Sequence, residues 1–202
     1  MKVIVLIFFL ISELLCAQMV VPDGFGKIPD SLYFKNTLYR SIIPDKKYEF
    51  WEVIRKYDSL REDIIYKNKD WTNKSRIKVH SQDQGFFIEC LLDWCFTYIM
   101  LLDDKKLRYI NNEEDLRNFI GYVDNLQEAL LIAGTYGFWF DKKDPVGGTF
   151  REDKDYFYLY LAKSESCPVS REAFFIKLNK KTRTFESQTK GGYYKTGDCF
   201  IS

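Results

Sequence analysis

The chain has little of what most catalytic sites require. It contains a single histidine, His80, and no metal-ligating partner stands at a suitable spacing from it. Nucleophilic catalysis of the Ser–His or Cys–His kind would therefore depend on His80 alone. The glycines fit no phosphate-binding or dinucleotide fingerprint. We therefore predict no cofactor and no metal, and a lone histidine of this kind is more typical of a structural or surface position.

An excess of charge of either sign is also lacking. Lys and Arg number 30 against 29 Asp and Glu, which gives a formal net charge of +1. Positive and negative residues are mixed, as in Arg151–Asp155, and no block of five or six like charges appears. Nucleic-acid binding depends on such a positive excess. The composition therefore predicts no nucleic-acid partner.

The first seventeen residues have the layout of a secretory signal peptide. Lys2 is followed by the apolar run Val3–Ile11, and Ala17 provides a small residue before Gln18. A positive start, a short apolar stretch and a small residue at the cut are the three parts of such a signal. The Cys-Ala-Gln ending resembles export signals of Gram-negative envelope proteins. We expect cleavage after Ala17 and a periplasmic or secreted protein.

Two alternatives compete for this segment. A membrane anchor needs about 20 apolar residues, whereas Ser12-Glu13 ends the run after Ile11. A lipoprotein would be anchored through Cys16, but bulky Leu15 occupies the place where lipoprotein signals have a small residue. We therefore expect no stable membrane span after cleavage, and lipid anchoring is the less favoured alternative.

After cleavage four cysteines remain, Cys90, Cys95, Cys167 and Cys199. An even number in an exported protein is typical of disulfides, and four cysteines allow three connectivities. Cys167 and Cys199 lie in polar, loop-like surroundings near the C-terminus, so we predict that they pair. Cys90 and Cys95 lie within an apolar run. The sequence there is compatible with a disulfide and equally with two buried free thiols.

The apolar fraction of 46% and the aromatic fraction of 17% indicate a folded core. Pro and Gly punctuate residues 18–44, which we expect to form an extended leader before a single α+β domain over residues 45–202. Three-four spacing of apolar residues predicts a helix over Lys46–Ile65. Phe86–Leu102 is predicted as one long or two short strands, although its length also allows a buried helix. Leu107–Ile110 is predicted as the second arm of a hairpin.

Two further helices have clear start signals. Asn111-Asn112 precedes three acidic residues, and Asn125 stands three residues before Glu128, as in a capping box. The remaining chain reads as successive antiparallel strands: Phe138–Phe140, Thr149–Glu152, Tyr156–Ala162, Ala173–Leu178 and Thr182–Gln188. We therefore predict an antiparallel sheet of four to six strands with two or three helices packed on one face.

Tyrosines alternate with apolar residues over Tyr156–Leu161. Successive side chains of a strand point to opposite faces, so Tyr156, Tyr158 and Tyr160 share one face at about 7 Å spacing. If that face is open, the three rings form an amphipathic platform suited to protein or glycan partners. The alternative is that they pack as core against the helix Leu126–Ala133.

The other residues of the sequence that could form a catalytic site are carboxylates. Glu89 and Asp93 lie within the apolar run Phe86–Leu102, and a spacing of four places both on one strand face. A pair of this kind is compatible with glycosidase-like acid–base catalysis. It is equally compatible with the exposed face of a half-buried strand.

The C-terminal half resembles a PepSY-type domain of exported proteins over residues 125–188. Glu128-Ala129 and Ala133 match its helix, Tyr156–Leu161 its middle strand, and Phe175–Leu178 with Asn179–Thr182 its last strand and turn. Arg183 stands where the family has glycine. The resemblance implies an inhibitory or regulatory interaction module and brings no catalytic residues.

The leading functional hypothesis is therefore an exported, non-enzymatic binding or inhibitory module of the bacterial envelope. Its partner would be a protein or glycan that contacts the tyrosine face. The alternative is a carboxylate-dependent hydrolase acting on cell-wall or polysaccharide substrates, and a purely structural envelope protein is a third possibility.

Overall fold

The computed structural model describes residues 19–57, 61–71, 79–88 and 95–199. The predicted signal peptide, with Cys16, lies outside them. The described strands form two antiparallel sheets of five and four strands. The larger sheet has the order β1 (Gly26–Lys27), β6 (Gly148–Glu152), β7 (Tyr156–Ser166), β8 (Val169–Asn179), β9 (Phe185–Lys195). The smaller sheet has the order β3 (Glu62–Lys67), β2 (Phe50–Lys56), β4 (Phe96–Asp103), β5 (Lys106–Ile110).

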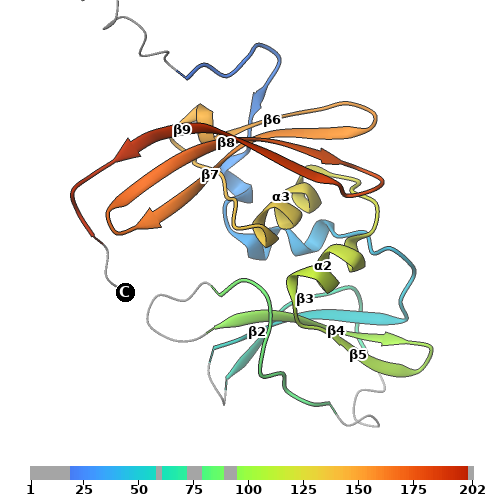
Figure 1. The fold of residues 1–202 in the computed structure, drawn as a ribbon. Helices are drawn as coiled ribbons and strands as arrows, with labels where there is room; N and C mark the ends of the chain where they lie inside the picture. The colour runs from blue at the N-terminus through green and yellow to red at the C-terminus, as the bar shows by residue number, and fades with distance from the viewer. Residues whose placement is uncertain (1–18, 58–60, 72–78, 89–94, 200–202) are drawn as a thin grey trace, which may run out of the picture.

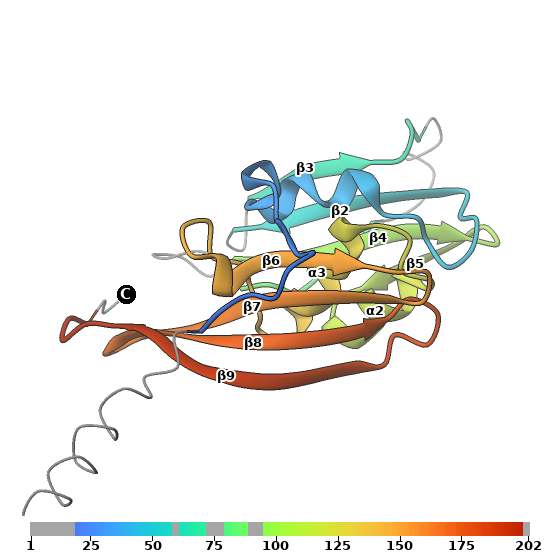
Figure 2. The same cartoon turned by 90° about the horizontal axis from the view of Figure 1, so that it is seen from above.

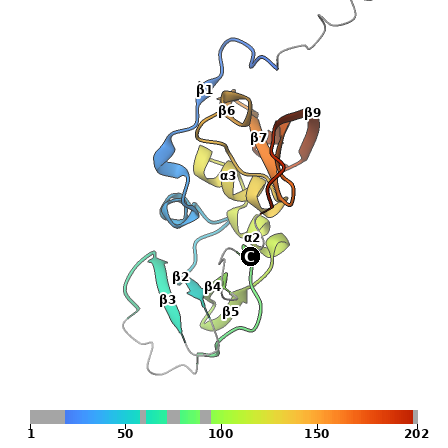
Figure 3. The same ribbon diagram turned by 90° about the vertical axis from the view of Figure 1, so that its left-hand side faces the viewer.

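Two α-helices, α2 (Glu113–Ile120) and α3 (Leu126–Thr135), connect the sheets along the chain. Figures 1 and 3 show the two sheets as separate layers with α2 and α3 between them. Figure 2 views the molecule from above and shows β6, β7, β8 and β9 side by side, with β9 at the edge. In the described part of the chain no helix is long and apolar enough to cross a membrane.

Both helices start where the sequence predicts. The Asn112 side chain accepts a hydrogen bond from the Asp115 backbone N–H at 2.9 Å, and Asn125 accepts one from Glu128 N–H at 3.0 Å. Each asparagine thus satisfies a backbone donor that the first turn leaves free. Gly121 ends α2 with a positive φ of 68°, and a Cβ there would lie 2.7 Å from Asp45 Cα.

One hydrophobic cluster joins both sheets and the helices. It contains Phe157, Leu159 and Leu161 of β7, Val53 of β2, and the segment Leu130–Ala133 of α3, all of them buried. Because α3 is apolar on almost every side, it suits a position between two layers. A second cluster covers the opposite face of the four-stranded sheet and includes Tyr98 and Met100.

The fold class is α+β, as predicted, but the predicted single sheet is two sheets. The C-terminal strands are confirmed with shifted bounds: β7 ends four residues later than predicted, β8 starts four residues earlier, and β9 covers Phe185–Lys195 in place of Thr182–Gln188. The Lys106–Ile110 arm of the hairpin with β4 is also confirmed. Phe138–Phe140 makes only an isolated bridge, Trp139 to Ala162.

The predicted helix over Lys46–Ile65 is wrong, because this region forms β2 and β3. β2 is buried on both faces: Phe50 and Ile54 enter one cluster, while Trp51 and Val53 enter the other. A strand buried on both sides loses the alternation that marks strands and shows a continuous apolar run instead. The three-four spacing of apolar residues is compatible with a helix. The segment is a strand because it pairs with β4.

The segment predicted as an extended leader, residues 18–44, is part of the fold where it is described. It contains three short 3-10 turns, Asp30–Leu32, Lys35–Thr37 and Tyr39–Ser41. Ile28, Leu38 and Tyr39 are fully buried in the main cluster. The proline and glycine content reflects the turns between these anchoring residues, and does not mark a solvated linker.

Candidate binding surface

The tyrosine row lies on the face of the five-stranded sheet that points away from α3, here called the outer face. Phe157, Leu159 and Leu161, which alternate with the tyrosines, are fully buried in the cluster that includes α3. The alternative in which the tyrosines pack against α3 therefore does not describe the structure. Tyr156 and Tyr158 are half-buried.

The three tyrosines are not equally accessible. Tyr160 is only 7% exposed, because Phe25 packs edge-on against it at 5.1 Å between ring centroids and Phe175 lies at 5.3 Å. The Tyr158 ring stacks beside Phe175, with centroids 6.2 Å apart and planes 16° apart. The usable aromatic surface therefore consists of Tyr156, Tyr158 and Phe175.

Cationic side chains cover these rings. The Arg151 guanidinium lies 4.7 Å from the Tyr158 ring centroid, Lys177 Nζ lies 4.2 Å from that of Tyr156, and Lys190 Nζ lies 5.6 Å from that of Phe175. Such contacts hold a cation over the negative face of a ring. A partner approaching the outer face thus meets positive charge as well as aromatic surface.

One carboxylate on this face fixes the central tyrosine. The Tyr158 hydroxyl donates to Asp153 Oδ2 at 2.9 Å. The backbone N–H groups of Asp155 and Tyr156 both donate to Asp153 Oδ1 and are the main cause of its lowered pKa. Asp153 therefore remains an anion and keeps the Tyr158 ring in place.

A pocket of about 170 Å³ adjoins the same face beyond Tyr160. Its walls include Trp139, Asp141 and Arg171. Arg171 Nη1 donates to Asp141 Oδ2 at 2.6 Å, and the Tyr193 hydroxyl donates to the same oxygen at 3.0 Å. Asp141 Oδ1 accepts the Lys143 backbone N–H at 2.8 Å.

These hydrogen bonds keep the Asp141 side chain in its ionised form. Burial tends to raise the pKa of Asp141, but hydrogen bonds from Lys143, Tyr193 and Arg171 outweigh it, and the pKa is lowered. Burial beside this carboxylate raises the pKa of Tyr193. The sequence gives no local sign of this group, because its members come from three distant segments. Asp141, Arg171 and Tyr193 all lie outside the predicted strands, so no predicted strand face indicated that they would meet.

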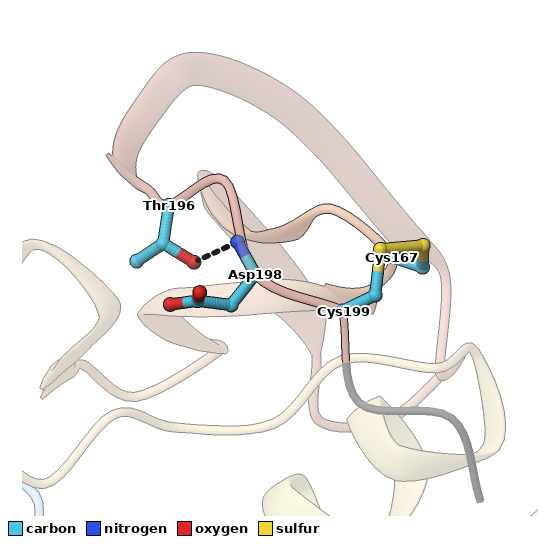
Figure 4. The surroundings of a disulfide bond; sticks show 4 residues. All are labelled: Cys167, Thr196, Asp198 and Cys199. Atoms are coloured by element: carbon cyan, nitrogen blue, oxygen red, sulfur yellow. Dashed lines mark hydrogen bonds between the residues drawn. A yellow bond between two sulfur atoms is a disulfide. The ribbon is translucent and has the colours of Figure 1, made fainter.

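The predicted Cys167–Cys199 disulfide is present (Figure 4), with a Cα–Cα distance of 4.2 Å. It ties the turn between β7 and β8 to the chain after β9. Two backbone hydrogen bonds reinforce the link, from Val169 N–H to Asp198 at 2.8 Å and from Thr196 N–H to Val169 at 2.9 Å. Cys90 lies outside the described residues, whereas Cys95 is fully buried and disulfide-bonded.

The predicted acid pair, Glu89 and Asp93, also lies outside the described residues. Another group of carboxylates, Asp45, Asp103 and Asp115, lines a pocket of about 290 Å³ beside β5 and α2. The hydrogen bond from Lys46 at 2.8 Å lowers the pKa of Asp103. Asp103 is therefore held as an anion, which suits an ion pair with Lys46 and Arg108 better than proton donation.

His80 is exposed, and its backbone N–H donates to the Tyr109 hydroxyl at 2.9 Å. Over residues 19–57, 61–71, 79–88 and 95–199, no cluster of His, Cys, Asp and Glu is arranged to hold a metal ion. Comparisons of the chain with protein-family models, with curated proteins and with solved structures give no match. Its function is therefore inferred from its own residues and their arrangement.

Proposed function

We propose that this protein is an exported, non-enzymatic binding or inhibitory module of the bacterial envelope that contacts its partner through the outer face of the five-stranded sheet. The observation that carries the proposal is the difference between the two faces of β7. Phe157, Leu159 and Leu161 on its inward side are fully buried, while Tyr156 and Tyr158 on the other side remain half-buried beside Phe175. Tyrosine and arginine are the residue types enriched at the centres of binding interfaces.

The charges on this face support an anionic partner. Arg151, Lys177 and Lys190 surround the rings. They outnumber the two carboxylates of the face, which are Asp153, engaged by the Tyr158 hydroxyl and two backbone donors, and Glu186, opposite Lys177 in β9. Cations at the border of an interface steer oppositely charged partners toward it. The partner would therefore be an acidic envelope protein or glycan.

Export is supported by the disulfide. Bonds such as Cys167–Cys199 persist in the periplasm and outside the cell and are rare in the cytosol. The signal-peptide interpretation of residues 1–17 and the PepSY-like interpretation of residues 125–188 remain predictions. An inhibitory role is compatible with both.

Tyr158→Ala tests the proposal. Because Tyr158 is the central ring of the surface, its removal is expected to reduce recovery of the partner from periplasmic extract by about fivefold or more. Tyr122→Ala is the matched control, since Tyr122 is 46% exposed in the connection between α2 and α3. Partner recovery is measured by quantitative mass spectrometry. Equal recovery by wild type and both variants would remove the outer face from consideration.

The carboxylate-dependent hydrolase is the second candidate, and the pocket with Asp45, Asp103 and Asp115 is the observation that favours it. Asp115 accepts a hydrogen bond from the Asn112 side chain at 2.7 Å, at the start of α2. Release of reducing ends from cell-wall polysaccharide that is lost in Asp115→Asn would support this function. Absence of release by the wild-type protein would exclude it for the substrates tested.

A further inference from the structure

The pocket beside Arg171 continues the line of the tyrosine row. Ala162 and Ser164 follow Tyr160 at alternate positions of β7, so they share its face. Trp139 bridges to Ala162, and Arg171 pairs with Ser164 in the register of β7 and β8. Residues directly opposite each other in antiparallel strands share a face, which places Ala162, Ser164 and Arg171 on the outer side, while Trp139 lies at the sheet edge and also packs against the main cluster.

Positive charge predominates among the side chains that line the pocket. Lys142, Lys143 and Arg171 face a single carboxylate, Asp141, which is buried. Both oxygens of Asp141 already accept hydrogen bonds. The Arg171 guanidinium has five N–H donors, and its hydrogen bond to Asp141 uses one of them. With the side chain 36% exposed, donors remain for an incoming anion.

Aromatic walls flank these cations in fixed orientations. The Trp139 indole N–H donates to the Tyr33 carbonyl at 3.1 Å. Lys35 Nζ lies 4.1 Å from the centroid of the Trp139 ring, and Lys142 Nζ lies 4.2 Å from that of Tyr33. Trp139, with Lys35 over one face of its ring, thus forms an aromatic edge of the pocket that also contains Arg171.

The dimensions limit the ligand. About 170 Å³ is close to the volume of five or six water molecules and below the range of pockets for drug-sized ligands. A single ring or a chain end therefore fits. Arginine binds carboxylates through paired N–H groups, and the C–H faces of a sugar ring pack on indole and phenol rings.

We propose that this pocket binds one carboxylate-bearing sugar unit of an acidic glycan, with its carboxylate on Arg171 and Lys142 and its ring against Trp139. The inference rests on the proposed function, because it names the class of partner for the outer face. The next units of the glycan would run along β7 toward Tyr158. Sugar rings repeated along a chain, each with an apolar C–H face, match aromatic side chains repeated along a strand better than an acidic peptide does.

The test is calorimetric titration of the full chain with D-glucuronate. D-Glucose, acetate and N-acetyl-aspartate amide are the comparison ligands, since they lack the carboxylate, the ring and the sugar respectively. We expect glucuronate to bind at least about tenfold more tightly than each of them. Equal binding of acetate or of N-acetyl-aspartate amide would overturn the assignment to an acidic sugar, as would failure of glucuronate to bind.

Three variants locate the binding. Arg171→Gln is expected to weaken glucuronate binding by about tenfold or more, because a charged hydrogen bond is lost. Lys142→Gln keeps the result interpretable if Arg171→Gln unfolds, since Lys142 is exposed; about threefold weaker binding is expected. Lys163→Gln is the control on the opposite face, where Lys163 lies over Phe138. Unchanged affinity in both Arg171→Gln and Lys142→Gln would overturn the site.

Failure of this inference is distinguishable from failure of the proposed function. Tyr122→Ala should leave binding of glucuronate unchanged, because Tyr122 lies in the connection between α2 and α3 and outside the pocket. If Tyr158→Ala loses the envelope partner while wild-type protein does not bind glucuronate, the outer face remains the binding surface and the acidic-sugar pocket is refuted. If glucuronate binds but Tyr158→Ala loses no partner, the pocket stands without the tyrosine platform.

Discussion

Replacement of both Cys167 and Cys199 by serine is expected to lower the free energy of unfolding by about 3–4 kcal/mol. The bond closes a loop with a sequence separation of 32 residues. In the chain-entropy model, opening such a loop returns conformational freedom to the unfolded chain and so favours unfolding. For a chain of this size the change corresponds to a fall in Tm of about 10 °C.

Thermal and urea unfolding of the wild-type protein and of the Cys167→Ser/Cys199→Ser variant measure this effect. Reductant alone is a poor substitute for the variant, because it also acts on the disulfide of Cys95. Adding reductant to the double variant measures the contribution of the Cys95 disulfide to the free energy of unfolding. Unfolding midpoints that coincide for wild type and double variant would contradict the prediction.

The disulfide also bears on the outer face. It anchors the end of β9 to the start of β8, and Tyr193 and Arg171 lie near those two ends. Both side chains bond to Asp141. We therefore expect the pocket to lose order before the rest of the sheet when the bond is removed.

The parts of the fold that were predicted correctly depend on local signals. Asn112 and Asn125 predict helix starts because their side chains can cap the first turn. The alternation in Tyr156–Leu161 predicts a strand with one buried face. The disulfide followed from cysteine count and polar surroundings. Each of these signals is contained within a few residues, or within the composition of a short segment.

The parts that were missed depend on contacts between distant segments. β2 looks helical because both of its faces are buried, and only its pairing with β4 makes it a strand. The turns at residues 30–41 are anchored by Leu38 and Tyr39 against a core formed mainly by later segments. The Asp141 group joins three segments separated by up to 52 residues. No pattern within one segment contains such information.

Glu128→Ala is expected to lower the free energy of unfolding by about 2–5 kcal/mol near pH 5. Glu128 is fully buried, and its two oxygens accept backbone N–H groups from Ile43 at 2.6 Å and from Asp124 at 2.7 Å. Alanine leaves both backbone donors without their side-chain acceptor. It also removes the hydrogen bond that joins Ile43 to α3, which weakens the attachment of residues 19–44 at that point.

Denaturant unfolding of the variant measures this cost. Gln127→Ala is the matched control, since Gln127 is the adjacent, only half-buried residue of α3. Its replacement should change the free energy of unfolding by less than about 1 kcal/mol. Equal effects of the two substitutions would contradict the bridging role of Glu128.

The cost of Glu128→Ala should fall as the pH rises. Burial raises the pKa of Glu128 to about 7, although the hydrogen bonds from Ile43 and Asp124 oppose the shift. In the unfolded chain the group titrates near 4.3. The folded state therefore holds the proton more tightly, and its stabilising effect, complete below about pH 4, is lost as the pH rises through about 7.

Between pH 5 and pH 8 the stability difference between wild type and Glu128→Ala should shrink by about 2–3 kcal/mol. The alanine variant supplies the baseline, because every other titrating group is common to both proteins. Urea unfolding at half-unit pH intervals gives the profile, and Gln127→Ala should follow the wild-type curve. A difference that stays constant or grows with pH would mean that the folded protein holds Glu128 as an anion at pH 5. The two backbone N–H groups would then outweigh the cost of burying its charge.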